Sequence, residues 1–221
     1  FDRLECDKWK TSCQNCIQAK KYSWFFDCSQ KNFMRKSNSL KGVDLTVITP
    51  SRWLGELVKQ SFLKENTIKV INNGIDLETF KYTEGDFREK HDFVNKKIVL
   101  GVSYVWDYSK GLDVFIELSQ KLPDDYKIVI VGTNDYVDKL LPLNIFSVHC
   151  THNQKELAEI YSAADIFVNP TREENFPTVN MEALACGTPV VTFRTGGSPE
   201  MLDETCGSVV ECNDTEAMAK E

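Results

Sequence analysis

Two glutamates, Glu174 and Glu182, have the residue type and spacing that best fit ligand chemistry in this chain. Glu174 lies in a polar loop, residues 172–177, that follows a short apolar strand. Glu182 follows Thr178 by four residues, so a helix there would place both on one face. A carboxylate in that position could accept hydrogen bonds from both hydroxyls of a ribose. Glu174 would then stand at the mouth of the same crevice.

The junction between this loop and the helix predicted over residues 178–186 favours a phosphate. The first amides of a helix have no partner inside it and lie at the positive end of the helix dipole. The candidate donors are the amides of Phe176, Thr178 and Val179. Pro177 has no N–H to give, although it belongs to the same predicted binding loop. Gly187 is a suitable residue to end the helix, because glycine tolerates the left-handed conformation found there.

The sequence E-N-F-P-T-V-N-M-E-A-L-A-C-G-T-P-V from Glu174 onwards resembles a known donor-binding signature. It belongs to family 4 of the retaining, nucleotide-sugar-dependent glycosyltransferases of GT-B fold, also called glycosyl transferases group 1. The resemblance implies that Glu182 holds the ribose and that Glu174 contacts the donor sugar near the reacting centre. It also implies retention of anomeric configuration without a catalytic metal. Outside that context, Glu182 would be a carboxylate in the first turns of a surface helix, where the dipole favours it.

Transfer from a nucleotide diphosphate sugar builds negative charge on the departing diphosphate, so a cation aimed there lowers the barrier. Lys110 is the best candidate catalytic cation, because the family has a Lys-Gly pair at this point and Gly111 follows here. By itself, Lys110 would be an exposed loop lysine. The family usually has a Gly-Arg pair after the preceding strand, whereas Gly101 is followed by Val102. We expect Arg172, or a residue outside this sequence, to replace that arginine.

From residue 96 onwards, short apolar runs alternate with helical patterns, which predicts an α/β fold with a doubly wound, Rossmann-like parallel sheet. The predicted strands are 97–102, 127–132, 145–148, 165–168 and 189–193, and the predicted helices are 112–122, 154–163 and 178–186. Ligands of such sheets bind beyond the carboxyl ends of the strands. Gly132 lies at that edge and is a further candidate binding residue. Gly132-Thr133-Asn134 does not match a G-x-G-x-x-G dinucleotide motif.

His149, Cys150 and His152 follow the strand predicted over 145–148. By residue type they could bind a metal. They have no carboxylate partner that is visible in the sequence. We therefore interpret them as loop residues beside the pocket for the nucleotide base, with His149 as a binding residue.

Residues 1–40 form a cysteine-rich segment of the N-terminal domain with the spacing C-x6-C-x2-C-x11-C. Its cysteines are Cys6, Cys13, Cys16 and Cys28. Cys13 and Cys16 can bind one metal through two thiolates, and the other two would complete a four-ligand structural zinc site. The segment resembles a C-x6-C-x2-C-P insert of some bacterial polysaccharide glycosyltransferases, with Ile17 at the proline position. Free thiols, or disulfides in an oxidising compartment, stay open as alternatives, because the full spacing is not that of a standard zinc finger.

Residues 41–85 are expected to end the N-terminal acceptor domain and to form the linker. A strand over 41–50, a helix over 52–63 capped by Ser51, and a strand over 67–71 precede an Asn-Gly turn. This succession resembles the close of the first Rossmann-like domain in the same family, although a simple αβ unit fits it equally well. Residues 86–221 would be the nucleotide-sugar-binding domain, cut short. The chain starts without Met and ends in a predicted helix, so we interpret it as a fragment.

Composition excludes several other classes of protein. The chain has 221 residues, of which 42% are hydrophobic and 27% charged, as in ordinary globular proteins. The net charge of -7 provides no basic field for nucleic acid. No apolar run approaches the ~18 residues that a membrane-spanning helix needs.

Taken together, these patterns predict a cytoplasmic glycosyltransferase of bacterial polysaccharide or capsule assembly. It would transfer a hexose from a nucleotide diphosphate sugar to a glycan or a lipid-linked acceptor. Peripheral association with the inner face of the membrane would run through the missing N-terminal part. This fragment could be inactive alone, because half of the cleft is absent. The alternatives are a sugar-nucleotide epimerase of the same fold and a non-catalytic interaction module held together by zinc.

Overall fold

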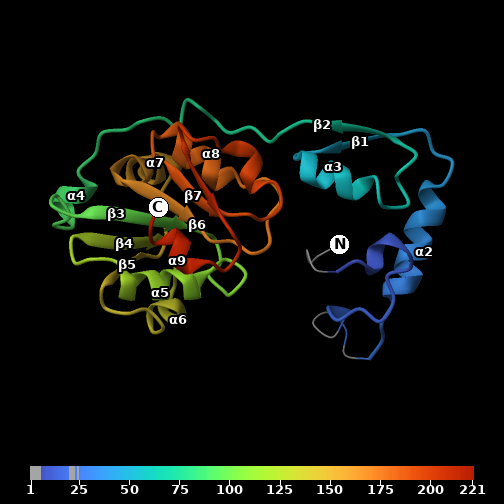
Figure 1. Ribbon diagram of the computed structural model, residues 1–221, viewed down its shortest axis with the longest axis horizontal. Helices are drawn as coiled ribbons and strands as arrows, with labels where there is room; N and C mark the ends of the chain where they lie inside the picture. Colours follow the sequence, from blue (N-terminus) through green and yellow to red (C-terminus); the bar gives the residue numbers. More distant parts are fainter. Residues whose placement is uncertain (1–5, 20–22, 24) are drawn as a thin grey trace. The chain divides into compact units, whose positions relative to one another are not determined.

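The computed structural model describes residues 6–19, 23 and 25–221 (Figure 1). The predicted segment 1–40 therefore lies partly outside the described residues. Contacts divide the chain into two compact units, Phe1–Asn72 and Asn73–Glu221, and each is described by itself. No helix among the described residues is both long and apolar enough to cross a lipid bilayer.

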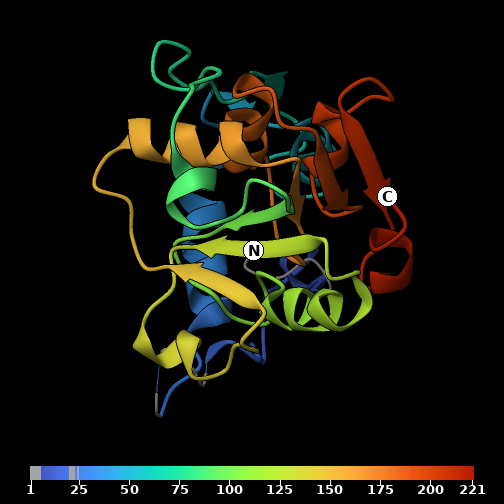
Figure 2. The same ribbon diagram turned by 90° about the vertical axis from the view of Figure 1, so that its left-hand side faces the viewer.

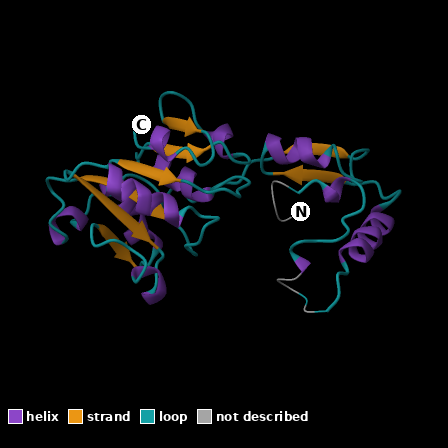
Figure 3. Cartoon of the chain, turned by 60° about the horizontal axis from the view of Figure 1, so that its bottom comes forward, coloured by secondary structure: helices purple, strands orange, loops and turns teal. Residues whose placement is uncertain are grey.

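The first unit contains one pair of parallel strands together with short helices (Figure 3). Its elements are η1 (Lys8–Lys10), α2 (Ser29–Leu40), β1 (Thr46–Thr49), α3 (Arg52–Val58) and β2 (Thr67–Val70). The hydroxyl of Ser51 accepts a hydrogen bond from the amide of Leu54, as the predicted cap requires. The helix ends at Val58 instead of reaching residue 63. Ser61 explains the early end, because its hydroxyl donates to the Val58 carbonyl and accepts from the Leu63 amide.

The second unit is built on a six-stranded, fully parallel sheet. Its strands are β3 (Lys97–Val102), β4 (Tyr126–Val131), β5 (Ile145–Val148), β6 (Ile166–Asn169), β7 (Val190–Phe193) and β8 (Gly207–Val210). Its helices are α4 (Phe87–Lys90), α5 (Leu112–Lys121), α6 (Asp135–Asp138), α7 (Gln154–Ala163), α8 (Thr178–Ala185), η2 (Ser198–Met201) and α9 (Thr215–Met218). The predicted α/β class with a doubly wound parallel sheet is confirmed.

Helices cover both faces of this sheet, which is why its strands are apolar on both sides. Figures 1 and 2 show α7 and α8 on one face and α5 and α9 on the other. Along β3 the side chains alternate: Ile98 and Leu100 join the core beneath α7 and α8, whereas Val99 joins the core beneath α5. The sheet therefore separates two hydrophobic cores.

The strand order β5-β4-β3-β6-β7-β8 contains one reversal. The chain runs outward from β3 to β5, then returns through α7 to place β6 on the other side of β3. In doubly wound sheets, ligands bind outside the carboxyl ends of the strands at such a switch point. The topology thus points to the ends of β3 and β6.

The last strand, β8, was not among the predicted strands. Its sequence Gly-Ser-Val-Val is short, and only Val210 is fully buried. Gly207 lies so close to β7 that a Cβ atom there would come within 2.0 Å of the Val190 carbonyl oxygen. The close approach of the two backbones determines where this strand lies, and a pattern of apolar residues does not reveal such an approach.

Residues 73–85 were expected to close the N-terminal domain and form the linker, and their contacts group them with the second unit. Phe80 is buried, and its ring packs edge-on against Tyr161 at 6.4 Å between centroids. The amide of Thr83 donates to the Ser162 hydroxyl. The contacts therefore divide the chain at 72/73, upstream of the expected 85/86 boundary.

Candidate functional site

A cleft of about 440 Å³ lies at the carboxyl ends of β3 and β6, where the topology points. Its walls are residues 102–106 with Lys110 after β3, and residues 168–170, Glu174 and 176–179 after β6. Of the predicted site residues, the cleft brings together Lys110, Glu174, Phe176, Pro177, Thr178 and Val179. The size suits a small ligand.

Lys110 and Glu174 face each other in this cleft, with 3.1 Å between Nζ and Oε2. Both side chains are partly exposed, at 36% and 21%. The two loops can approach closely because Gly111 has a φ of +75°, and a Cβ atom there would meet the Pro170 carbonyl oxygen at 2.6 Å. A glycine after the lysine is therefore what allows the pair to form.

The start of α8 forms the opposite part of the wall. Pro177 occupies the N-cap position and makes no side-chain capping hydrogen bond. Thr178 and Val179, which open the helix, both line the cleft. Their amides belong to the first turn and have no partner within the helix. The arrangement can receive an anionic group next to the Lys110 ammonium.

Glu182 lies one turn further along α8 and is not part of the cleft lining. Its Oε2 accepts a hydrogen bond from the Tyr161 hydroxyl at 3.1 Å. Burial raises the pKa of Glu182, while hydrogen bonds from Tyr161 and Thr178 work in the opposite direction. Thr178 lines the cleft, so its hydrogen bond to Glu182 places the Glu182 carboxylate next to the cleft.

Arg172 is held outside the cleft by several partners. Its guanidinium makes a two-pronged contact with Asp113, at 2.9 and 2.8 Å, and lies over the ring of Tyr108 at 3.8 Å. The Arg172 side chain is only 12% exposed. It ties the loop after β6 to the start of α5. Its expected role toward a diphosphate stays a prediction. To bind a diphosphate, the guanidinium would have to give up its contact with Asp113.

Gly132 has a structural reason for being glycine. Its φ is +89°, and a Cβ atom there would lie 1.8 Å from the Ser103 carbonyl oxygen. Ser103 lines the cleft, so the absence of a side chain at Gly132 lets the end of β4 support the cleft wall. Gly132 itself is not in the lining, and its binding role stays a prediction.

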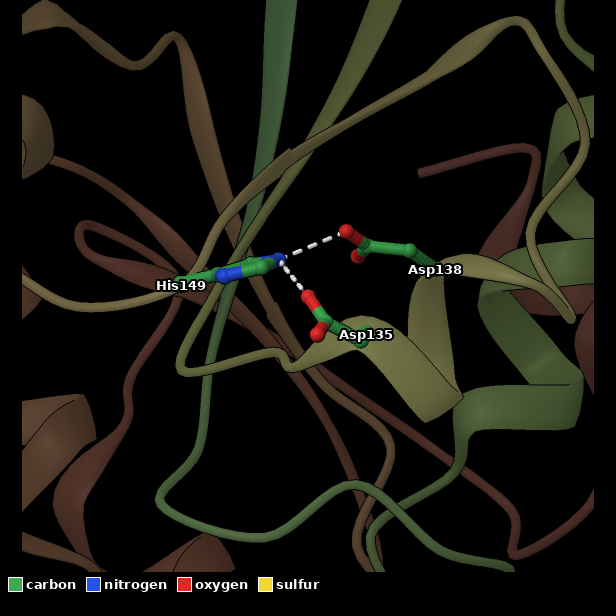
Figure 4. A group of neighbouring side chains, drawn as sticks. All are labelled: Asp135, Asp138 and His149. Atoms are coloured by element: carbon green, nitrogen blue, oxygen red, sulfur yellow. Dashed lines mark hydrogen bonds and ion pairs between the residues drawn. The ribbon is translucent and has the colours of Figure 1, made fainter.

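His149 does have carboxylate partners, contrary to the interpretation from sequence. Figure 4 shows its ring between Asp138, 2.6 Å from Nε2, and Asp135, 4.0 Å away. Hydrogen bonding to Asp138 raises the pKa of His149 and lowers that of Asp138. Both aspartates come from α6, which packs beside β5 only in the folded chain. Among the described residues, this is the one group of three metal-type side chains with ligand atoms within 4.8 Å.

The His149 imidazole should titrate above its ordinary pKa of about 6.5. Because the pKa of His149 is higher in the folded than in the unfolded chain, the ion pair stabilises the fold fully below the unfolded pKa. This stabilisation is lost as the pH rises through the folded pKa. NMR titration of the ring carbons measures this pKa directly. Asp138→Asn should return it toward the ordinary value, and Asp135→Asn should have a smaller effect. An unchanged pKa in Asp138→Asn would contradict the pairing.

All eight cysteines of the chain are described, and all are free thiols. Of the four in the N-terminal segment, Cys6, Cys13 and Cys16 are partly buried and Cys28 is exposed. The pKa of Cys13 is raised, first by burial and then by Cys16 and Cys6. The thiols thus influence one another, but their sulfurs do not gather as closely as the ligand atoms around His149.

Three contacts made by predicted site residues could not be found from the sequence. Tyr161 and Glu182 are 21 residues apart, Asp113 and Arg172 are 59 apart, and Asp138 and His149 are 11 apart. Only the folded sheet brings the members of each pair together.

Comparison with known proteins gives the family context. Residues 96–221, more than half of the chain, match the family model described as Glycosyl transferases group 1. The chain is 34% identical, over 157 residues, to N,N'-diacetylbacillosaminyl-diphospho-undecaprenol alpha-1,3-N-acetylgalactosaminyltransferase of Campylobacter jejuni, covering 66% of this chain and 42% of the relative. The chain spans about a third to a half of the length of the curated relatives it matches.

Solved structures share the fold. Sucrose-phosphate synthase from Thermosynechococcus elongatus superposes with a TM-score of 0.73 at 25% identity, over 93% of this chain and 55% of that chain. Anabaena HepE, solved in complex with UDP-glucose, gives a TM-score of 0.71 at 22% identity, over 87% of this chain and 57% of that chain.

Proposed function

Since the chain belongs to the glycosyl transferases group 1 family, we propose that it carries the donor-binding half of a retaining hexosyltransferase. The donor is a nucleotide diphosphate sugar. The observation that carries this proposal is the cleft at the β3–β6 switch point, where Lys110, Glu174 and the start of α8 meet.

Each residue has a defined task in this proposal. The Lys110 ammonium and the first amides of α8 stabilise the charge that develops on the departing diphosphate. Glu182 accepts hydrogen bonds from the ribose hydroxyls, next to Thr178. Glu174 contacts the donor sugar, and its ion pair with Lys110 fixes its orientation until the donor enters. These tasks need no catalytic metal.

The proposed acceptor is a glycan or a lipid-linked sugar, and the name of one relative supports the lipid-linked class. The Campylobacter jejuni relative is named for transfer to a diphospho-undecaprenol acceptor. An acceptor of that kind would bring a cytoplasmic enzyme to the inner face of the membrane, in the setting of bacterial polysaccharide or capsule assembly. The family description and this relative's name both refer to transfer, so neither epimerisation nor a purely binding role is favoured.

Nucleotide binding tests the proposal. UDP, GDP, ADP and their hexose conjugates should be compared by thermal unfolding, because a ligand at 100 times its Kd adds about 2.7 kcal/mol of stability. One base is expected to stand out, and its sugar conjugate should be turned over by the full-length protein. No shift with any nucleotide at millimolar concentration would refute the proposed donor site. Interconversion of free sugar nucleotides without transfer would support the epimerase instead.

Glu182→Ala should weaken binding of that nucleotide by about 1–3 kcal/mol, the range for lost hydrogen bonds to a charged group. The half-buried carboxylate is the only acceptor assigned to the ribose in this proposal. Calorimetric titration gives the Kd. Glu117→Ala, on the exposed side of α5, is the control and should leave the Kd unchanged. Equal affinities of the wild type and Glu182→Ala would leave Glu182 without a ligand role.

The cysteine-rich segment is proposed to hold one structural zinc ion through Cys6, Cys13, Cys16 and Cys28. The influence of Cys6 and Cys16 on the Cys13 thiol supports this, since it indicates that three thiols lie near one another. Zinc would lower the thiol pKa values and draw the four sulfurs together. Elemental analysis of protein purified without chelators should find one equivalent per chain. A content well below one equivalent would rule zinc out.

A further inference from the structure

Tyr161 is one of the largest fully buried side chains of the second unit, with 0% exposure. Its ring packs edge-on against Phe80 and Phe167, with centroids 6.4 and 5.5 Å away. Its backbone carbonyl accepts a 2.6 Å hydrogen bond from the Thr188 hydroxyl. The ring is therefore fixed by packing and cannot turn to seek another partner.

The Tyr161 hydroxyl places a polar atom in these surroundings, and a buried hydroxyl needs a hydrogen-bond partner. That partner is Glu182, at 3.1 Å. Phenylalanine would fill the same space between Phe80 and Phe167 without this requirement. Packing alone thus does not account for the hydroxyl.

The contact also restricts Glu182. One carboxylate oxygen, Oε2, is held by Tyr161 from α7, and the Thr178 hydroxyl interacts with the carboxylate from within α8. Cys186 is the other titratable neighbour, and burial raises its pKa to about 11, so it stays neutral at pH 7. Neutral donors therefore orient the charge of Glu182.

We propose that Tyr161 is a positioning residue, whose hydroxyl holds Glu182 in the orientation that receives the ribose hydroxyls of the donor. This inference rests on the proposed function and extends it to a residue on a neighbouring helix. A side chain fixed by packing can hold a binding group in place where a mobile one cannot. Tyr161 does not itself touch the ligand.

The test compares a ribonucleotide with its 2′,3′-dideoxy analogue, using the base identified by thermal unfolding. In Tyr161→Phe, affinity for the ribonucleotide should fall about 3- to 10-fold. Affinity for the dideoxy analogue should not change, because it offers Glu182 no hydroxyl. In a Glu182→Ala background, Tyr161→Phe should have no further effect on either ligand.

Tyr126→Phe is the matched control. It removes a tyrosine hydroxyl at the amino end of β4, where that hydroxyl accepts a 3.5 Å hydrogen bond from Lys97. It should leave both affinities as they are. If Tyr161→Phe leaves the ratio of the two affinities unchanged, whether both fall equally or neither falls, the positioning role is overturned while the donor site stands. A wild type that binds neither ligand would overturn the proposed function, and this inference with it.

Discussion

Replacing Lys110 by Met should lower the rate of sugar transfer by about 10²- to 10³-fold, the loss seen when one group that stabilises transition-state charge is removed. Lys110 is the one lysine or arginine of the described residues that lines the cleft. The change also leaves Glu174 without its partner, and so disturbs the group expected to contact the sugar. Because the negative charge near Lys110 grows as the diphosphate departs, nucleotide binding should weaken less than turnover.

The measurement is steady-state kinetics of the full-length protein, with kcat and KM determined separately. Lys139→Met is the matched control: that lysine is exposed at the end of α6 and is not part of the cleft lining, so its loss should not affect kcat. Lys110→Arg should recover part of the rate, since it restores a cation. Full turnover by Lys110→Met would show that the charge on the leaving group is stabilised by other residues.

Gly132→Ala should destabilise the fold by about 3 kcal/mol or more. Two costs combine there. At φ +89° a residue with a Cβ atom is strained, and that atom would lie 1.8 Å from the Ser103 carbonyl oxygen, which is backbone and cannot swing aside. The loop after β3 would have to move away from the end of β4.

Gly187→Ala separates the two costs. Gly187 has a nearly equal φ of +86°, but nothing lies within 4 Å of the Cβ position. Its substitution should cost only the conformational strain, about 1–2 kcal/mol. Urea unfolding of both variants gives the difference, which measures the collision at Gly132. Equal losses of unfolding free energy in the two variants would mean that the loop containing Ser103 moves aside without destabilising the fold.

Much of the second unit could be predicted from the sequence, because local signals coincide with the final fold there. The run from Lys97 to Val102 is a strand as expected, since both faces of β3 are covered and every interior position is apolar. The loop–helix unit around Glu174 forms as predicted, and Lys110 reaches the same cleft.

The rest depends on contacts that no local pattern contains. Arg172 looked available for a phosphate, but Asp113, far away in sequence, occupies it. His149 looked unpartnered because its aspartates lie on another element. The early end of α3 at Val58 depends on which way one hydroxyl, that of Ser61, turns. In each case the hydrogen-bond partner of a single polar side chain is determined by the folded structure, so the local sequence does not reveal it.

The position of β6 beside β3 has a consequence for how this protein acquires its ligand site. Val99 pairs with Ile166, so the two walls of the cleft come together only after the chain closes a loop of 166 − 99 = 67 residues. A chain that had assembled β3, β4 and β5 would already display its lysine, with no glutamate opposite. The pairing of β6 with β3 and the formation of the cleft are therefore one and the same folding event.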